Sequence, residues 1–110
     1  MKKRDLRLKE YNIGRNRYRE LLYFSLQYKE YKGISGKKKR RLIEEAVRAS
    51  VEAVYRGSRT EDMRECLLKG VTRDDITYEY LYMRLNIPCS RDMYWKMKRK
   101  YFSLLDKSRG

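Results

Sequence analysis

The sequence predicts an all-α protein, a compact bundle of about five helices with a C-terminal helix-turn-helix. Apolar residues recur at steps of three and four, no stretch alternates as a β-strand does, and glycine or proline separates the periodic stretches. The chain has 110 residues, of which 41% are hydrophobic, so it is long enough for one domain with a modest core. Within this single domain, 1–110, we expect a basic N-terminal arm (1–12), a helical pair (13–56) and a helix-turn-helix region (57–110).

The N-terminal arm begins MKKR and shows little continuous apolar pattern. Chain ends of this composition are commonly disordered, although a basic arm also suits contact with a phosphate backbone. Both interpretations stay open.

Two amphipathic helices are expected in the helical pair: residues 16–31, and Leu42 to about Arg56. The first has a face rich in aromatic residues, which is more often core than ligand site. The second has an apolar stripe with small residues that permit close packing. Gly33 and Gly36 lie between them and predict a connection. The two faces consist of Tyr18, Leu21, Leu22, Ser25 and Tyr28, and of Ile43, Ala46, Val47, Ser50 and Val54.

Five consecutive cations stand at the start of the second helix: Lys37, Lys38, Lys39, Arg40 and Arg41. Positive charge is unfavourable there, because the helix dipole prefers negative charge at the N-terminus. A locally costly feature invites a functional explanation, and phosphate contact is the simplest. A solvated basic linker is the alternative of about equal weight, since lysine runs are common in loops.

The helix-turn-helix region is expected to open with a short helix that Thr60 caps and Gly70 stops. A second helix is capped by Thr77, and Ile76 and Leu81 stand at the two ends of a hydrophobic staple. These signals predict a short bracing helix just before the last one.

Pro88 ends the bracing helix, because it lacks an amide hydrogen and disfavours helical geometry in the residue before it. Ser90 then caps the last helix. The buried seam of that helix is expected to consist of Tyr94, Met97, Tyr101 and Leu105. Its exposed side is expected to hold Arg91, Asp92, Trp95, Lys96 and Arg99.

In a helix-turn-helix the first helix braces the second, whose exposed side chains enter the DNA major groove. Seven lysines and arginines and two aspartates follow Cys89. This excess of cations favours a DNA-reading helix over a generic helical hairpin with a solvated face.

Three segments carry a resemblance to a known family: EDMRECLL, ITYEYLYMRLNIP and SRDMYWKMKRKYFSLL. From roughly Thr60 to Leu105 the chain resembles the sigma-factor region 4-type helix-turn-helix of phage late-transcription regulators, the RinA and ArpU groups. The segment RYRELLYFSLQYKEYK, together with IPCSRDMYWKMKRKYFSLL, also resembles small proteins encoded in Firmicute phages and mobile elements.

The resemblance implies a DNA-binding transcriptional regulator of a phage or mobile element. The sequence departs from the family pattern at Tyr82, where a small residue is usual, and in the length of the turn from Asn86 to Ser90. Both departures affect the angle between the two helices. The implied groove-facing positions are Arg91, Trp95, Lys96 and Arg99, and the implied phosphate-facing positions are Thr77, Tyr78 and Lys98 or Lys100.

The formal net charge is +14 at pH 7: residues 1–41 carry +11, residues 42–88 carry −2 and residues 89–110 carry +5. Self-repulsion of this size suits a protein whose partner is a polyanion. Double-stranded DNA is therefore the expected partner, with RNA polymerase and a second copy of the chain as further candidates. No stretch has the apolar length of a membrane-spanning helix or the pattern of a signal peptide, so we expect no membrane partner and a cytoplasmic location.

Catalysis is not expected. The chain has no histidine, which excludes the common triads and histidine metal sites. Asp74 and Asp75 have no third ligand in register, and Cys66 and Cys89 are interpreted as reduced, partly buried residues. No cofactor or metal is expected.

The competing interpretation is a basic helical protein that binds RNA, or a nucleoprotein complex such as RNA polymerase, without reading DNA sequence. Its tyrosines would then form a stacking or protein-contact surface.

Overall fold

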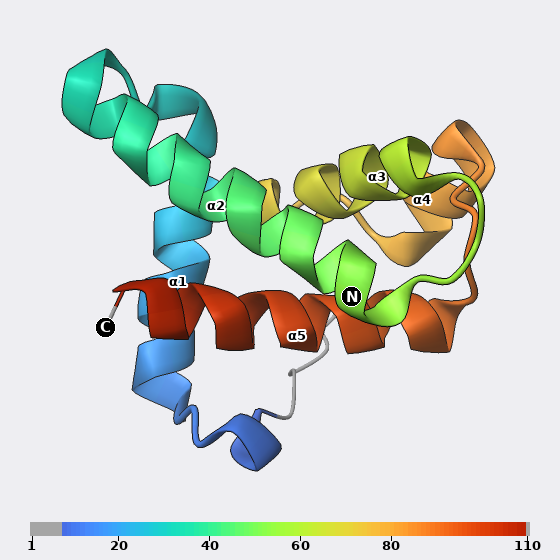
Figure 1. The fold of residues 1–110 in the computed structure, drawn as a ribbon, viewed down its shortest axis with the longest axis horizontal. Helices are drawn as coiled ribbons and strands as arrows, with labels where there is room; N and C mark the ends of the chain where they lie inside the picture. The colour runs from blue at the N-terminus through green and yellow to red at the C-terminus, as the bar shows by residue number, and fades with distance from the viewer. Residues whose placement is uncertain (1–7, 110) are drawn as a thin grey trace.

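Helix α5 (Arg91–Arg109) runs through the middle of the molecule, and α1, α2 and α3 all pack on it. The computed structural model describes residues 8–109, which form helices joined by turns and short loops (Figure 1). The other elements are η1 (Lys9–Tyr11), α1 (Arg15–Leu26), η2 (Tyr28–Glu30), α2 (Gly33–Val54), α3 (Thr60–Thr72) and α4 (Tyr78–Leu85), with η denoting a single 3-10 turn. The predicted all-α bundle with five helices is confirmed.

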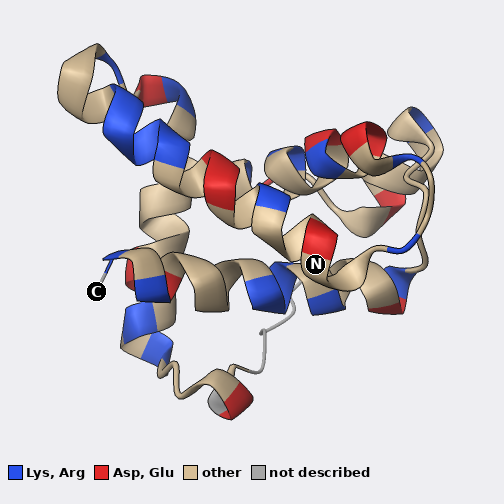
Figure 2. Ribbon diagram, viewed as in Figure 1, with Lys and Arg blue, Asp and Glu red and all other residues tan. Residues whose placement is uncertain are grey.

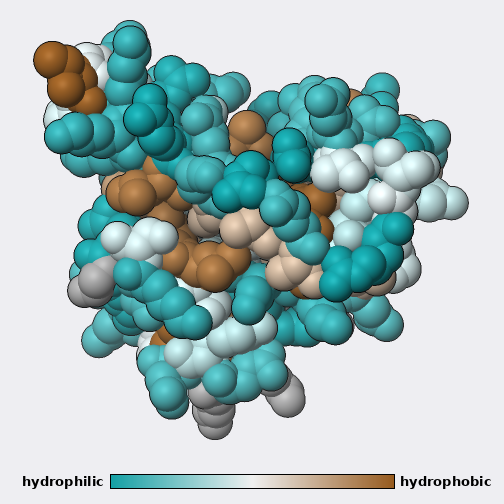
Figure 3. All heavy atoms as spheres, in the orientation of Figure 1, coloured by the Kyte–Doolittle hydropathy of each residue, from teal (hydrophilic) through white to brown (hydrophobic). Residues whose placement is uncertain are grey.

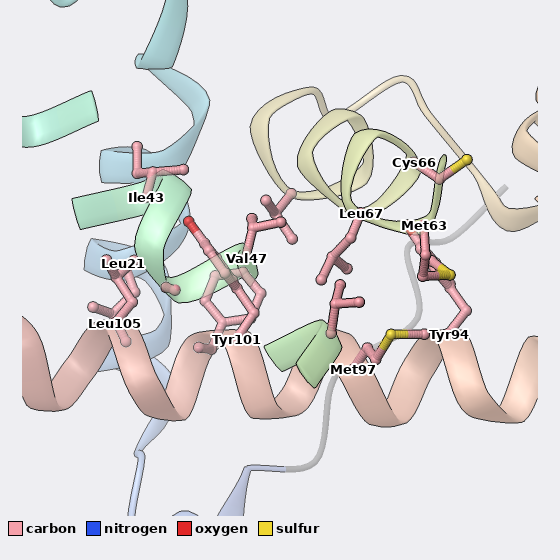
Figure 4. Packing of buried hydrophobic residues seen from close by; sticks show 14 of the residues in the cluster. Leu21, Ile43, Val47, Met63, Cys66, Leu67, Tyr94, Met97, Tyr101 and Leu105 are labelled. Atoms are coloured by element: carbon pink, nitrogen blue, oxygen red, sulfur yellow. The ribbon is translucent and has the colours of Figure 1, made fainter. Parts of the chain in front are cut away.

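The predicted seam of α5 is the centre of the core, and side chains from α1, α2 and α3 converge on it (Figure 4). Tyr94, Met97, Tyr101 and Leu105 are each at most 1% exposed. Phe102 and Ser103 are buried as well, so α5 is enclosed over a wider arc than its periodicity predicts. Full burial of one large apolar side chain contributes about 1.5–3 kcal/mol, so this helix supplies a large share of the hydrophobic stabilisation.

Helix α2 has the most extensive packing on α5. Its predicted stripe is buried at four positions and half-buried at Val54, and Val51 adds to it. The small residues Ala46 and Ser50 let the backbones approach, and Ser50 Oγ donates to the Ala46 carbonyl at 2.6 Å. The stripe therefore buries its one hydroxyl without leaving it unpaired.

Helix α2 begins at Gly33 rather than at Leu42. Gly36 is buried inside its first turns, where a β-carbon would lie 2.6 Å from the Tyr31 carbonyl carbon. This glycine permits a close backbone contact and does not interrupt the helix. The run Lys37 to Arg41 consequently lies within α2, which corrects its interpretation as a linker.

Helix α3 runs through Gly70 to Thr72, so the predicted stop at Gly70 is wrong. Gly70 is buried, and a β-carbon there would overlap the hydroxyl oxygen of Tyr94 and lie 3.1 Å from its Cζ. The glycine is explained by this close contact with α5. The predicted cap is also wrong, because Arg59 occupies the N-cap position and forms no side-chain capping bond.

Helix α1 ends at Leu26, and residues 28–30 form η2, so the helix predicted over 16–31 is shorter than expected. The Tyr31 hydroxyl donates to the Phe24 carbonyl at 2.7 Å. This bond satisfies one of the carbonyls that the end of an α-helix leaves without a helical partner.

A buried polar pair joins α1 to α5. Ser25 Oγ donates to the Leu21 carbonyl at 2.9 Å, and the Tyr101 hydroxyl lies 2.7 Å from Ser25 Oγ. Because the serine proton is already committed, Tyr101 is the donor in the second bond. Nearer the surface, Arg17 Nε donates to Asp106 at 2.6 Å, which fixes the same crossing from its edge.

The ends of α4 and the start of α5 follow the predicted signals. Thr77 accepts a hydrogen bond from the Tyr80 amide at 3.1 Å, and Ser90 Oγ accepts one from the Met93 amide at 3.2 Å. Asn86 adopts a left-handed conformation with φ 54° and ends α4. Both predicted caps are confirmed.

The described end of the predicted N-terminal arm is ordered against the bundle, and residues 1–7 lie outside the described range. Leu8 and Ile13 are 3% and 6% exposed, and the Tyr11 and Ile13 amides both donate to the Leu8 carbonyl. From Leu8 onwards, the segment predicted as a basic N-terminal arm therefore packs against the bundle.

We expect Gly70→Ala to destabilise the protein by about 1–3 kcal/mol, the usual cost of overpacking, despite the better helix propensity of alanine. In a Tyr94→Phe background the same change should cost at most about 1 kcal/mol, because the overlapping hydroxyl is gone. Chemical denaturation of the four proteins measures this coupling. Equal costs in both backgrounds would show that the hydroxyl is not the obstacle.

We expect Ser25→Ala to cost about 1–3 kcal/mol, because it leaves the Tyr101 hydroxyl buried without an acceptor. Tyr101→Phe should cost less in hydrogen bonding, since Ser25 keeps its bond to the Leu21 carbonyl. Urea titration gives both free energies of unfolding. A larger loss for Tyr101→Phe than for Ser25→Ala would contradict this assignment of donor and acceptor.

Candidate nucleic-acid interface

The first two turns of α5 present exposed polar side chains, and so does its end, where Lys107, Ser108 and Arg109 are exposed. Arg91, Asp92 and Lys96 are exposed, as predicted. Arg91 forms an ion pair with Glu79 of α4, and its guanidinium carbon lies 5.1 Å from the centroid of the Tyr78 ring. The side chains of Arg91 and Glu79 are still about half exposed, so solvent screens the pair and an external anion can compete for the arginine.

Trp95 is half-buried and does not lie on the open side predicted for it. Its ring packs edge-on against Tyr94, with centroids 5.6 Å apart, and Lys98 Nζ lies 4.9 Å from the Trp95 centroid. Lys98 is also half-buried. These contacts hold an indole and an ammonium group together on one side of α5.

Arg99 and Lys100 are half-buried, so the exposed stripe of α5 is interrupted after Lys96. The Arg99 side chain is 31% exposed, and its Nε lies 3.7 Å from the Glu10 carboxylate. The N-terminal turn thus approaches the side of α5 that was predicted to be open. The expectation that Arg99 stands free on the exposed side is wrong.

Thr77 and Tyr78 both have structural roles. Thr77 is exposed but uses its side chain to cap α4. The Tyr78 hydroxyl donates to the Cys89 carbonyl at 2.6 Å, which ties α4 to the turn before α5. These two residues orient α4 against α5, whatever further contacts they make.

The run Lys37 to Arg41 is exposed along its whole length. Lys39 Nζ lies 5.3 Å from the centroid of the Tyr31 ring, and the Arg40 guanidinium lies 4.9 Å from that of Tyr28. This basic end of α2 projects from the bundle far from the start of α5 (Figures 1 and 2). The structure therefore does not bring the two predicted groups of cations together.

The same end of α2 carries an unusual apolar side chain. Ile34, in the first turn, is 82% exposed. Figure 3 shows hydrophobic surface at this end of α2 among hydrophilic surroundings.

Acidic and basic side chains occupy different parts of the surface. Figure 2 shows Asp and Glu gathered on α3 and the middle of α2, whereas Lys and Arg gather on α1, along α5 and at the start of α2. The outer side of α3 holds Glu61, Asp62 and Glu65, all exposed. Asp62 and Glu65 pair with Arg59 and Lys69, so α3 offers a polyanion less attraction than the basic surfaces do.

A groove of about 1020 Å³ lies between α1, the end of α3, the loop that follows it, and the first half of α5. Arg91, Trp95, Lys98, Thr77 and Tyr78 line this groove together. The other predicted residues, Lys96, Arg99, Lys100 and Lys37 to Arg41, do not. The groove is thus where the structure gathers the largest set of predicted site residues.

Sequence reasoning missed the contribution of α1 to this groove. Arg15, Tyr18 and Arg19 line it from the α1 side, and Arg73 lines it from the loop after α3. The only sequence signal for this part of the groove was the spacing of Arg15 and Arg19, which places two cations one helical turn apart. That spacing does not reveal which other segments lie opposite.

Residues 8–109 contain two thiols and several exposed carboxylates. No group of three or more Cys, Asp and Glu side chains in this range is arranged to hold a metal ion. Cys66 and Cys89 are free thiols, as predicted, and burial raises the pKa of both, that of Cys89 to about 11. Both thiols are therefore protonated and poorly nucleophilic at neutral pH.

No helix within residues 8–109 combines the length and the apolar character needed to cross a membrane.

Comparisons with protein-family models, curated proteins and solved structures found no match to this chain. Its function is therefore inferred from the chemistry of its surface.

Proposed function

We propose that this protein is a DNA-binding regulator that contacts duplex DNA with the first two turns of α5. The observation that carries the proposal is the exposure of Arg91 and Lys96 at the start of this helix, in a molecule of net charge +14. Glu79 and Asp92 are the carboxylates beside them. Contact with phosphates supplies most of the affinity of such proteins, and cations supply those contacts.

The order of elements supports a helix-turn-helix mode of binding. In that mode, residues near the N-terminus of the second helix reach base edges, while the first helix crosses the DNA backbone. Here α4 precedes α5 across a short turn, and Arg91, Asp92 and Lys96 are exposed at the start of α5. Arg91 and Lys96 are assigned to the DNA, with Asp92 between them available to discriminate bases by accepting from cytosine.

The other predicted residues of α4 and α5 are not assigned to base contacts. Arg99 and Lys100 lie beyond the exposed turns, and we assign them no contact with bases. Lys98 and Trp95 line the groove beside α5. Thr77 and Tyr78 hold α4 in place and keep their predicted position beside a phosphate.

The basic end of α2 is assigned to the phosphate backbone. Its five cations are exposed and lie on a helix that projects from the bundle, so a long duplex can reach them without displacing packed side chains. A contact of this kind adds affinity without sequence preference.

The competing function is binding of RNA or of a nucleoprotein complex without sequence readout. The aromatic residues that line the groove favour it, because unpaired bases stack on aromatic rings. Competition among random duplexes distinguishes the two functions: a sequence reader retains a subset of duplexes at physiological salt, whereas a general polyanion binder releases all of them together.

We expect Arg91→Ala to weaken binding to duplexes selected from a random pool by about 1–3 kcal/mol more than binding to unselected duplexes. Glu79→Gln should change the affinity in the opposite direction and strengthen binding several-fold, because it releases Arg91 and removes a negative charge beside the phosphates. Fluorescence anisotropy measures both, with Lys107→Ala at the far end of α5 as control. Unchanged affinity in both variants would remove the start of α5 from the interface.

We expect replacement of Lys37, Lys38 and Lys39 by glutamine to weaken binding equally for all duplexes. The slope of log K against log salt should fall by up to about 0.9 for each phosphate that the variant no longer neutralises. Lys69→Gln, on the acidic helix α3, is the matched control and should leave the slope unchanged. An unchanged slope in the triple variant would show that this run does not contact the phosphates.

A further inference from the structure

We propose that the groove beside α5 binds unpaired nucleotides, with one base stacked against Trp95. This inference shares with the proposed function a nucleic-acid ligand and Arg91, which also lines the groove, but it concerns a different form of the nucleic acid. The occupant is a short single-stranded segment, free or melted out of a duplex.

The groove is large enough for such a ligand and has aromatic walls. Its volume of about 1020 Å³ is at the upper end of the range for small-molecule sites. Half-buried rings line it from both sides: Tyr18 from α1, and Trp95 and Tyr78 from α5 and α4. Tyr18 is held edge-on against Phe102 at 5.1 Å, so the α1 wall is fixed in position.

The rings favour an unpaired base over a duplex. In a duplex both faces of each base are covered by its neighbours, so no π face is available to an indole in a groove. An unpaired base offers a free face, and stacking on an aromatic side chain depends little on which base it is. A concave aromatic surface therefore suits a single strand, whereas the exposed side chains at the start of α5 suit a duplex.

Two arginines of α1 supply the complementary charge. Arg91 is paired with Glu79, and Arg73 Nη2 lies 3.1 Å from Asp75. By contrast, Arg15 and Arg19 are exposed on α1 and form no ion pair with another side chain in the described part of the chain. Together with Lys98, whose Nζ lies 4.9 Å from the centroid of the Trp95 ring, they give the groove cations that can contact the phosphates of a bound strand.

Trp95 is the only tryptophan in the sequence, so its fluorescence reports directly on the groove. A mixed-sequence oligonucleotide of about twelve nucleotides should quench this emission as it saturates the protein. The same sequence as a blunt duplex should bind, by anisotropy, with little quenching. DNA and RNA versions of the strand distinguish the two sources of unpaired nucleotides.

Substitutions separate stacking from charge. Trp95→Leu should weaken single-strand binding by about 5- to 150-fold, the range for loss of one base–aromatic stack, while Trp95→Phe should retain most of the affinity. The double variant Arg15→Gln, Arg19→Gln should weaken single-strand binding more than duplex binding. Lys107→Gln, which is exposed on α5 outside the groove, is the charge-matched control for each arginine.

The outcomes separate this inference from the proposed function. Single strands that bind without quenching Trp95, or equal quenching by strand and duplex, would overturn the groove as a base site. Duplex binding that depends on Arg91 would survive either result. Quenching by the single strand with no duplex binding would instead support the groove and remove the duplex reader.

Discussion

The structure depends on α5 having one side buried in the core while other positions on the same helix face solvent. Tyr94, Met97, Tyr101 and Leu105 face the core, where α1, α2 and α3 all pack on α5. That packing fixes the rotation of α5, and the enclosure of Phe102 and Ser103 closes most of its second half. The exposed polar side chains of α5 are those of its first two turns and of residues 107–109 at its end. The region of α5 available for recognition is therefore set by packing and not by its content of cations.

The charge of the molecule is unevenly distributed over the bundle. Asp and Glu gather on α3 and the middle of α2, whereas α1, α5 and the start of α2 carry the excess of Lys and Arg. A few ion pairs, such as Arg17 with Asp106, sit where helices cross. The remaining cations repel one another, and bound polyanion would relieve that repulsion by displacing counterions.

Local signals were predictable from the sequence and contacts between remote segments were not. The caps at Thr77 and Ser90 and the seam of α5 depend on neighbours within two turns, and all were predicted correctly. Gly36 and Gly70 were predicted to interrupt helices. In the structure each glycine makes room for another segment, the Tyr31 backbone at Gly36 and the Tyr94 ring at Gly70, and the sequence does not reveal these contacts. The partial enclosure of Arg99 and the groove beside Trp95 arise from segments far apart in the sequence.

An NMR titration of backbone amides with duplex DNA at physiological salt tests the central claim most directly, since it maps the contacted surface without substitutions. The account predicts saturable shifts concentrated at residues 91–96, with further shifts at the start of α2 and none on the outer side of α3 around Glu61 and Glu65. Shifts confined to other surfaces, or loss of all binding at that salt concentration, would contradict the assignment of α5 as the helix that meets DNA.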